Sequence, residues 1–277
     1  TQGYSSAASD VYKRQLQEAA QSLKQAQDVL ILSHKSPDGD TLGSGFGLLH
    51  ALRAMGKGAW LFCQDQIPQK YLYLMDNLAD PLWDEKNTTE PQMVVAVDVA
   101  DAKLLGERLQ PFAGRVDLCI DHHGSNTGYA KRLLLRADAA ANCELMLDLL
   151  AAMGCPLTKS VANCLYTGLV TDTGCFRYNS TTVDSHRAAQ KLLAAGADMP
   201  MIHRIAFENV SRGKVTLMVE AMQKIRYELD GQCAAILLER DRINALGVTD
   251  DELEGIAALP RQIEGVRVGI TLRQYKS

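Results

Sequence analysis

Short runs of consecutive apolar residues recur along the first half of this chain, and they constrain its fold more than any other feature. They occupy residues 29–33, 59–63, 92–99 and 116–121. An unbroken apolar run of this length is typical of a strand buried on both faces of a sheet. Helical patterns at 41–55 and 139–153 lie among these runs. The alternation predicts βαβ units, and therefore an α/β fold built on a mostly parallel sheet.

The pattern changes after residue 196. Residues 199–228 have a helical pattern without a strand. Two further strands are indicated at 233–238 and 266–272, with a helical piece at 250–258 between them. The sequence ends directly after the second of these strands, so we interpret the last domain as truncated.

These patterns predict how the chain is divided into domains. Residues 1–15 show no useful period, and we expect a non-native or disordered tail there. The remaining segments are an N-terminal α/β domain at 16–196, a helical connector at 197–229 and a smaller α/β C-terminal domain at 230–277.

Composition excludes several classes of protein. The formal net charge of −4 argues against a general nucleic-acid coat protein, which needs a basic surface to bind phosphates. The seven cysteines form no C-x-x-C pair, so we expect a reducing cytoplasm rather than a disulfide scaffold. The chain has no uncharged apolar run of about 18 residues, so we expect no membrane span. The N-terminus also lacks the apolar core of a signal peptide.

Acidic and histidine side chains follow the predicted strands and one later helix. In an open α/β sheet the carboxyl ends of the strands line one crevice, so residues distant in sequence meet there. The residues expected to gather around this point are His34, Asp38, Asp40, Asp98, His122 and Asp172.

Carboxylates and imidazoles without a thiolate suit hard or borderline divalent ions such as Mn²⁺ or Mg²⁺. Carboxylates that crowd together need cations between them, because like charges at short range repel. Each residue has a simpler interpretation as well. Asp38 with Gly39 could form a turn, and Asp98 or Asp172 could cap a helix or turn. The joint arrangement nevertheless favours a two-metal site, which activates water and neutralises charge on a phosphoryl group. The remaining histidines, His50, His186 and His203, fit ordinary helical surroundings.

Four motifs in the correct order give the chain a family resemblance. Asp121-His122-His123 resembles the signature triplet of the DHH phosphoesterases. The segments at 33–44, 97–98 and 168–178 are similar to the first, second and fourth motifs of the same superfamily. The resemblance covers about residues 25–277 and is nearest to the bacterial nano-RNase (oligoribonuclease)/pAp phosphatase branch. It implies that 16–196 is the DHH catalytic domain and that 230–277 is part of the DHH-associated substrate-binding domain.

The resemblance implies two Mn²⁺ ions, for which Mg²⁺ or Co²⁺ could substitute. One ion would be held by His34, Asp38 and Asp98. The other would be held by Asp40, Asp98, His122 and Asp172, with Asp98 as the bridge. His123 would face the scissile phosphate, and Asp121 would orient a histidine. The residues implied as substrate contacts are Ser125, Asn126 and Arg177.

The implied function is hydrolysis of short oligoribonucleotides to mononucleotides and of pAp to AMP. Alternatives are a cyclic or linear dinucleotide phosphodiesterase, a RecJ-type exonuclease, a family II pyrophosphatase, and a nucleotide-binding module without turnover. The family's second domain normally carries a G-G-G-H segment, which this sequence lacks. We therefore interpret the chain as a fragment whose substrate clamp is missing. A homodimer is compatible with the resemblance.

Overall fold

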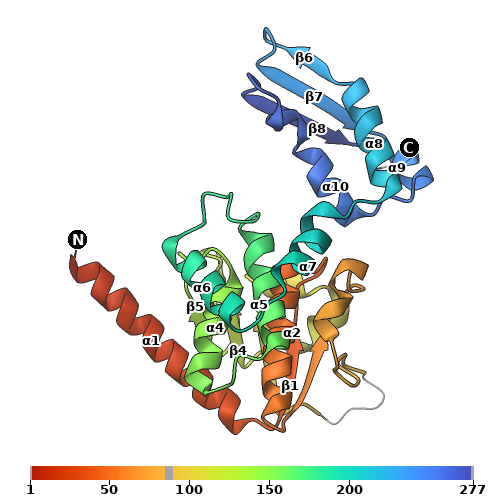
Figure 1. Ribbon diagram of the computed structural model, residues 1–277. Helices are drawn as coiled ribbons and strands as arrows, with labels where there is room; N and C mark the ends of the chain where they lie inside the picture. Colours follow the sequence, from red (N-terminus) through yellow and green to blue (C-terminus); the bar gives the residue numbers. More distant parts are fainter. Residues whose placement is uncertain (1, 85–89, 276–277) are drawn as a thin grey trace. The chain divides into compact units, whose positions relative to one another are not determined.

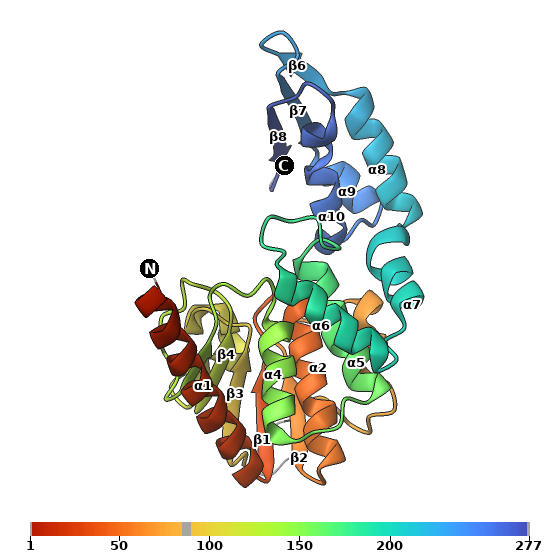
Figure 2. The same cartoon turned by 60° about the vertical axis from the view of Figure 1, so that its left-hand side comes forward.

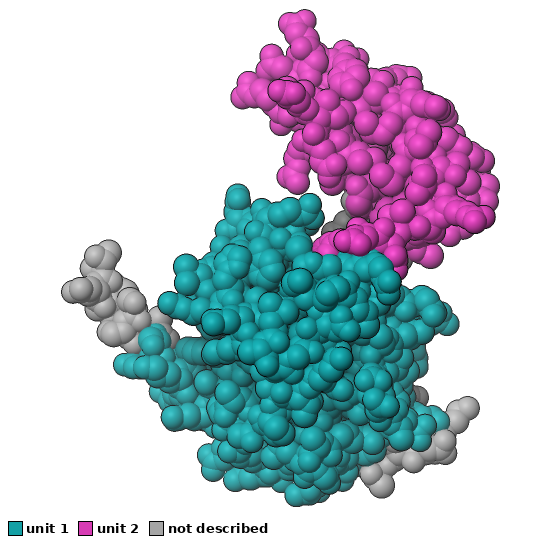
Figure 3. Space-filling model, viewed as in Figure 1, with its two compact units in different colours: residues 1–206 teal, residues 207–277 magenta. Residues whose placement is uncertain are grey.

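The computed structural model describes residues 2–84 and 90–275 and divides into two compact units, Thr1–Ala206 and Phe207–Ser277 (Figure 3). The boundary falls inside the segment that we expected to be a separate connector at 197–229. Helix α8 (Arg212–Gln223) belongs to the second unit, because Leu217 and Ala221, one helical turn apart, are buried in that unit's own core.

The first unit is built on a parallel sheet with strand order β2-β1-β3-β4-β5 (Figure 1). Leu30 on the central part of the sheet lies opposite Trp60 on one side and Val94 on the other. The strands are β1 (Asp28–Leu32), β2 (Gly58–Phe62), β3 (Met93–Val97), β4 (Leu118–Asp121) and β5 (Leu133–Leu135). We predicted the first four. Strand β5 went unnoticed because its three residues follow a basic run and only the middle one is fully buried.

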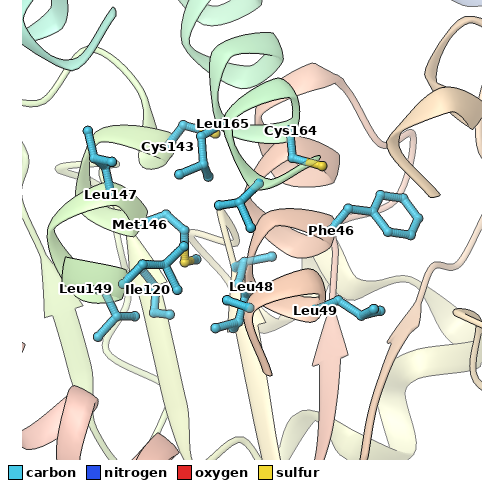
Figure 4. Packing of buried hydrophobic residues seen from close by; sticks show 14 of the residues in the cluster. Phe46, Leu48, Leu49, Ile120, Cys143, Met146, Leu147, Leu149, Cys164 and Leu165 are labelled. Carbon is cyan, nitrogen blue, oxygen red and sulfur yellow. The ribbon is translucent and has the colours of Figure 1, made fainter. Parts of the chain in front are cut away.

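Both faces of this sheet are covered, which is why the strands are apolar without alternation. Val29 and Ile31 of β1 face one core cluster, whereas Leu30 and Leu32 face another. Figure 2 shows the first face covered by long helices, and Figure 4 shows their side chains packed together. These helices are α1 (Gln2–Gln25), α2 (Gly39–Ala54), α4 (Asn142–Met153), α5 (Lys159–Asp172) and α6 (Val183–Ala194). The second face is covered by η2 (Ala102–Leu105), η3 (Glu107–Leu109) and α3 (Gln110–Ala113).

The N-terminal residues differ from our expectation of a disordered tail over 1–15. They belong to the continuous helix α1. The Tyr12 hydroxyl donates to Asp148 at 3.0 Å, and the Gln15 side chain accepts from the backbone N–H of Leu135 at 3.2 Å. Leu16 packs against the core beside them. A face made of one aromatic, one amide and one leucine side chain is too mixed to produce an apolar period.

Helices α2 and α5 approach each other unusually closely. Gly39, Gly43 and Gly47, spaced four residues apart on α2, all face α5. A Cβ on Gly43 would lie 2.5 Å from the carbonyl oxygen of Cys164, and a Cβ on Gly39 would collide with Thr171. The absence of these side chains therefore brings the N-terminus of α2 beside the C-terminus of α5.

The second unit has a small sheet of order β6-β7-β8, in which β6 is antiparallel and β8 parallel to β7. Its strands are β6 (Arg226–Glu228), β7 (Cys233–Leu238) and β8 (Val268–Arg273). We expected no strand within residues 199–228, but β6 lies there; it is exposed along its whole length and so carries no apolar signal. The helices of this unit besides α8 are α9 (Arg240–Ala245), α10 (Asp250–Ala257) and η5 (Leu259–Gln262).

The remaining helical segments are η1 (Gln69–Met75), α7 (Met199–His203) and a π-helical turn, η4 (Arg204–Glu208), at the boundary between the units. Within the described residues, no helix combines the length and apolar character that a bilayer crossing needs.

Candidate metal centre

The first unit brings all six predicted ligands together at the carboxyl ends of its strands. Their donor atoms form three groups, and within each group the atoms lie within 4.8 Å of one another. These groups are His34 with Asp38 and Asp98, Asp40 with His122 and Asp172, and Asp98 with His122 and His123. Since Asp98 and His122 each belong to two groups, the three groups form one continuous cluster.

Asp98 lies at the centre of the cluster, directly after β3. Its backbone has a left-handed φ of 59°, and its N–H donates to the carbonyl of Ile120 at 2.9 Å. This conformation is unfavourable for a residue with a side chain, although aspartate tolerates it better than most, and such strain concentrates at functional sites. The turn leaves the carboxylate 3% exposed, and its Oδ1 has no hydrogen-bond partner among the described residues.

The beginning of α2 supplies two further carboxylates. Asp38 is the N-cap of this helix and accepts from the backbone N–H groups of Asp40 and Thr41 at 3.0 and 3.1 Å. Asp40, in the first turn, is almost completely buried. Its two oxygens accept from the backbone N–H groups of Asn142 and Cys143 at 2.5 and 3.0 Å. The N-terminus of α4 therefore fixes the orientation of Asp40.

Two histidines present the same ring nitrogen to the cluster. Nδ1 of His34 donates to the carbonyl of Lys35 at 2.8 Å, and Nδ1 of His122 donates to the carbonyl of Ala139 at 3.1 Å. In the neutral ring, each hydrogen bond favours the tautomer in which Nε2 carries the lone pair, as is usual for histidines that bind metals. Nε2 of His122 lies 3.4 Å from an oxygen of Asp98 and 3.4 Å from an oxygen of Asp172.

The pKa values show how strongly these groups interact. Burial alone would lower the pKa of His122, but the carboxylates of Asp98, Asp40 and Asp172 outweigh it and raise this pKa to about 10. Burial and the neighbouring carboxylates of Asp98 and Asp172 raise the pKa of Asp40 well above its usual value. Burial is also the largest cause that raises the pKa of Asp172 to about 6.

This donor set fits a hard or borderline divalent cation. The six predicted ligands are four carboxylates and two imidazoles, and none of them is a thiolate. Within the described residues no donor forms a hydrogen bond with the buried Oδ1 of Asp98, and a buried carboxylate oxygen is strongly unfavourable unless a cation or hydrogen bond compensates it.

A hydrogen-bonded chain holds His123 at the edge of the cluster. Asp121 is completely buried and accepts from Nδ1 of His123 at 2.8 Å and from the amide of Asn126 at 2.6 Å. The Asp121 carboxylate raises the pKa of His123. Since Nδ1 is engaged, Nε2 is the nitrogen of His123 that remains available to a ligand. The side chain is 45% exposed, so a ligand can reach it.

Residues 28–169, slightly more than half of the chain, match the N-terminal domain of the DHH family. The chain belongs to the DHH family. It is 28% identical over 248 residues to the bifunctional oligoribonuclease and PAP phosphatase NrnA of Thermus thermophilus, across 89% of this chain and 72% of that protein. It is 29% identical over 208 residues to the cyclic-di-AMP phosphodiesterase GdpP of Geobacillus thermodenitrificans, across 68% of this chain and 31% of that protein.

Among solved structures, this DHH-family chain is similar to an exopolyphosphatase-related protein from Bacteroides fragilis. The TM-score is 0.82 at 24% identity, over 92% of this chain and 78% of the other. The resemblance that the sequence motifs suggested is thus confirmed by the family match, and the predicted α/β fold class is confirmed by the parallel sheet and by this similarity.

The three expected substrate contacts occupy different surroundings. Ser125 is exposed on the loop after the histidine pair, and Arg177 is exposed beyond α5. The Nε of Arg177 donates to the carbonyl of Gly174 at 2.7 Å. Asn126, in contrast, uses its amide nitrogen on Asp121 and its oxygen on the N–H of Gly128. Its role within the protein is to orient Asp121, which its sequence position alone did not reveal.

The other histidines lie outside the three groups. Nε2 of His50 lies 2.9 Å from the carbonyl of Leu74, and His186 stacks on Phe176. His203 stacks on Tyr166. The structure also adds Cys143 to the surroundings of the cluster, because its backbone N–H contacts Asp40. No local motif marks position 143 in the sequence.

Proposed function

We propose that this DHH-family phosphoesterase hydrolyses short oligoribonucleotides to mononucleotides and pAp to AMP, with two bound Mn²⁺ ions. The observation that carries the proposal is the position of Asp98, which belongs to two of the three groups of potential ligands and whose Oδ1 accepts no hydrogen bond from the described residues. The relatives named as bifunctional oligoribonuclease and PAP phosphatase support the choice of substrates.

We assign His34, Asp38 and Asp98 to one metal ion, and Asp40, Asp98, His122 and Asp172 to the other. When bound, two such ions supply Lewis acidity to a phosphoryl group and make water nucleophilic near neutral pH. The protein contributes ligands whose orientation is fixed in advance by the N-terminus of α4 and by two backbone carbonyls. Mg²⁺ or Co²⁺ could replace Mn²⁺ in this donor set.

His123 is the side chain that we assign to the reacting phosphate. Asp121 holds its Nδ1, so Nε2 is the nitrogen left for a ligand. The protonated ring, which Asp121 favours, donates a hydrogen bond to a phosphoryl oxygen and stabilises the charge that develops there. Asn126 supports this arrangement through Asp121, whereas Ser125 and Arg177 remain our proposed substrate contacts.

The test is turnover by the chain with Mn²⁺ on a 5′-labelled diribonucleotide and on pAp. We expect mononucleotide and phosphate release that EDTA and Asp98→Ala both abolish. Asp101→Ala is the matched control, because this neighbouring carboxylate belongs to none of the three groups and caps η2 instead. Activity that survives Asp98→Ala, or that is lost equally in Asp101→Ala, would contradict the assignment.

A second candidate function is hydrolysis of a cyclic dinucleotide. The similarity to a cyclic-di-AMP phosphodiesterase favours it, and the same cluster could carry out both reactions. Cyclic di-AMP and its linear product are therefore included in the assay. Hydrolysis of the cyclic form at a higher kcat/KM than the linear dinucleotide would favour this candidate over the first. The homodimer and the cytoplasmic location expected from the sequence remain predictions.

A further inference from the structure

The segment after α5 contains three consecutive residues in the left-handed region. The φ angles are 55° at Gly174, 57° at Cys175 and 63° at Phe176. Glycine adopts this region freely, but the other two do so only against steric resistance. Strain of this kind persists where the surrounding structure fixes it, and it concentrates at ligand-binding segments. The turn begins two residues after Asp172 of the metal cluster.

Thr173 fixes the conformation of this turn from inside the protein. Its carbonyl accepts from the backbone N–H groups of Arg177 and Tyr178, both at 3.0 Å. Its buried hydroxyl donates to the carbonyl of Leu169 at 2.7 Å and accepts from the N–H of Phe176 at 3.1 Å. The Phe176 ring in turn stacks on His186 of α6, with ring centroids 4.9 Å apart.

Tyr178 is the side chain that this rigid turn presents to solvent. Its N–H is held by Thr173, and its carbonyl accepts from the N–H of Thr181 at 3.0 Å. Its ring lies over Gly174, where an added Cβ would come within 2.5 Å of the ring carbons. The residue is nonetheless 53% exposed. One part of the ring therefore rests on the glycine while the rest is open to a ligand.

We propose that Tyr178 stacks on the nucleobase of the substrate and so makes the enzyme selective for nucleotides over other phosphate esters. The inference rests on the proposed function. Aromatic rings recognise bases of any sequence because every base has a flat π-face. A ring on a fixed backbone loses little freedom when a ligand binds, which favours recognition. The backbone of Tyr178 is held near the cluster because its N–H donates to Thr173, the residue next to Asp172.

The test compares pAp with the same bisphosphate lacking its base, a tetrahydrofuran 3′,5′-bisphosphate. We expect the wild-type chain to prefer pAp, as measured by kcat/KM. Tyr178→Ala should reduce this preference by about 5- to 150-fold, mainly through KM for pAp. Tyr178→Phe should keep the preference because the ring remains. Tyr178→Leu, which keeps an apolar side chain but has no π-electrons, should lose it, which separates stacking from simple apolar burial.

Equilibrium binding separates a failure of this inference from a failure of the proposed function. The probe is a non-hydrolysable bisphosphate that carries 2-aminopurine, whose fluorescence is quenched on stacking. We expect quenching with wild type and Tyr178→Phe and none with Tyr178→Ala. Quenching without turnover of any phosphate ester would retain the role of Tyr178 and reject the function. Equal binding and quenching by wild type and Tyr178→Ala, or no binding by wild type, would overturn the inference.

Discussion

Gly43→Ala should reveal how far the metal cluster depends on the close approach of α2 and α5. Asp38 and Asp40 stand at the beginning of α2, and Asp172 ends α5. Gly43 has no side chain, so at this position the backbone of α2 packs directly against the backbone of α5. A methyl group there meets two backbone atoms, the carbonyl oxygen of Cys164 at 2.5 Å and the nitrogen of Gly168 at 3.0 Å. Backbone cannot rotate away as a side chain can, so the helices must separate.

The expected magnitude follows from these distances. The shorter one is nearly an ångström below the 3.4 Å at which ordinary contact begins. Overpacking of this kind costs about 1–3 kcal/mol, and a clash with backbone belongs at the upper end. Alanine returns about 1 kcal/mol through its better helix propensity. The free energy of unfolding should therefore fall by about 2 kcal/mol, or about 4–8 °C in Tm for a unit of this size.

The assay is urea unfolding followed by tryptophan fluorescence. Both tryptophans, Trp60 and Trp83, lie in the first unit, so the signal reports this unit alone. Gly45→Ala is the matched control in the same helix, because its Cβ would meet the flexible end of Leu61 at 2.7 Å. We expect this control to be nearly neutral. Mn²⁺ affinity should fall about tenfold or more in Gly43→Ala only. Unchanged stability and affinity in Gly43→Ala would refute the reasoning.

Three further changes test other parts of the first unit. Burial raises the pKa of the Cys63 thiol to about 11, against 9.0 for an unperturbed thiol. Because the folded state keeps a proton that the unfolded chain releases, the free energy of unfolding should fall between pH 9 and 11, less steeply in Cys63→Ala. Tyr12→Ala removes a hydrogen bond to Asp148 and should destabilise the unit by about 1 kcal/mol or more in the same urea assay. Asn126→Ala leaves an oxygen of Asp121 without its donor, so kcat should fall while Mn²⁺ affinity stays within about twofold in calorimetric titration.

The strands that the sequence pattern predicts are the ones whose two faces are both buried. Residues 29–32 of β1 and all residues of β3 belong to one core cluster or the other, so an unbroken apolar run marks them. Strands β5 and β6 have three residues each and are partly or fully exposed, so neither burial nor alternation distinguishes them from a loop. Helix α1 was missed for a related reason. It is anchored at Tyr12 and Gln15 by polar atoms, which carry no apolar period.

The candidate site was predictable to the extent that sheet topology alone brings residues together. Asp98 and His122 follow neighbouring parallel strands, β3 and β4, so their proximity follows from the strand order. The interactions that orient the ligands were not predictable, because they depend on tertiary contacts. The bonds from the N–H groups of Asn142 and Cys143 to Asp40, and the bond from His122 to the carbonyl of Ala139, are of this kind.

Asp40 has a structural role at the beginning of α4 in addition to its proposed role as a metal ligand. A helix normally starts with a side chain that accepts from its first N–H groups, but the N-cap here is Ala141, which makes no such bond. Asp40 takes this place from a position a hundred residues earlier, by accepting from Asn142 and Cys143. The helix N-terminus in turn stabilises the carboxylate.

It follows that substitutions of Asp40 and Asp98 test different things. Asp40→Ala removes the cap of α4 together with a ligand, so lost activity in that variant would not separate metal binding from folding. The Oδ1 of Asp98 has no hydrogen-bond donor in the described part of the chain, and the N–H groups of Asn142 and Cys143 donate to Asp40 instead. Its removal spares this helix contact, but alanine tolerates the left-handed backbone at position 98 less well than aspartate does, so the variant that assigns lost metal affinity to the cluster itself is Asp98→Asn.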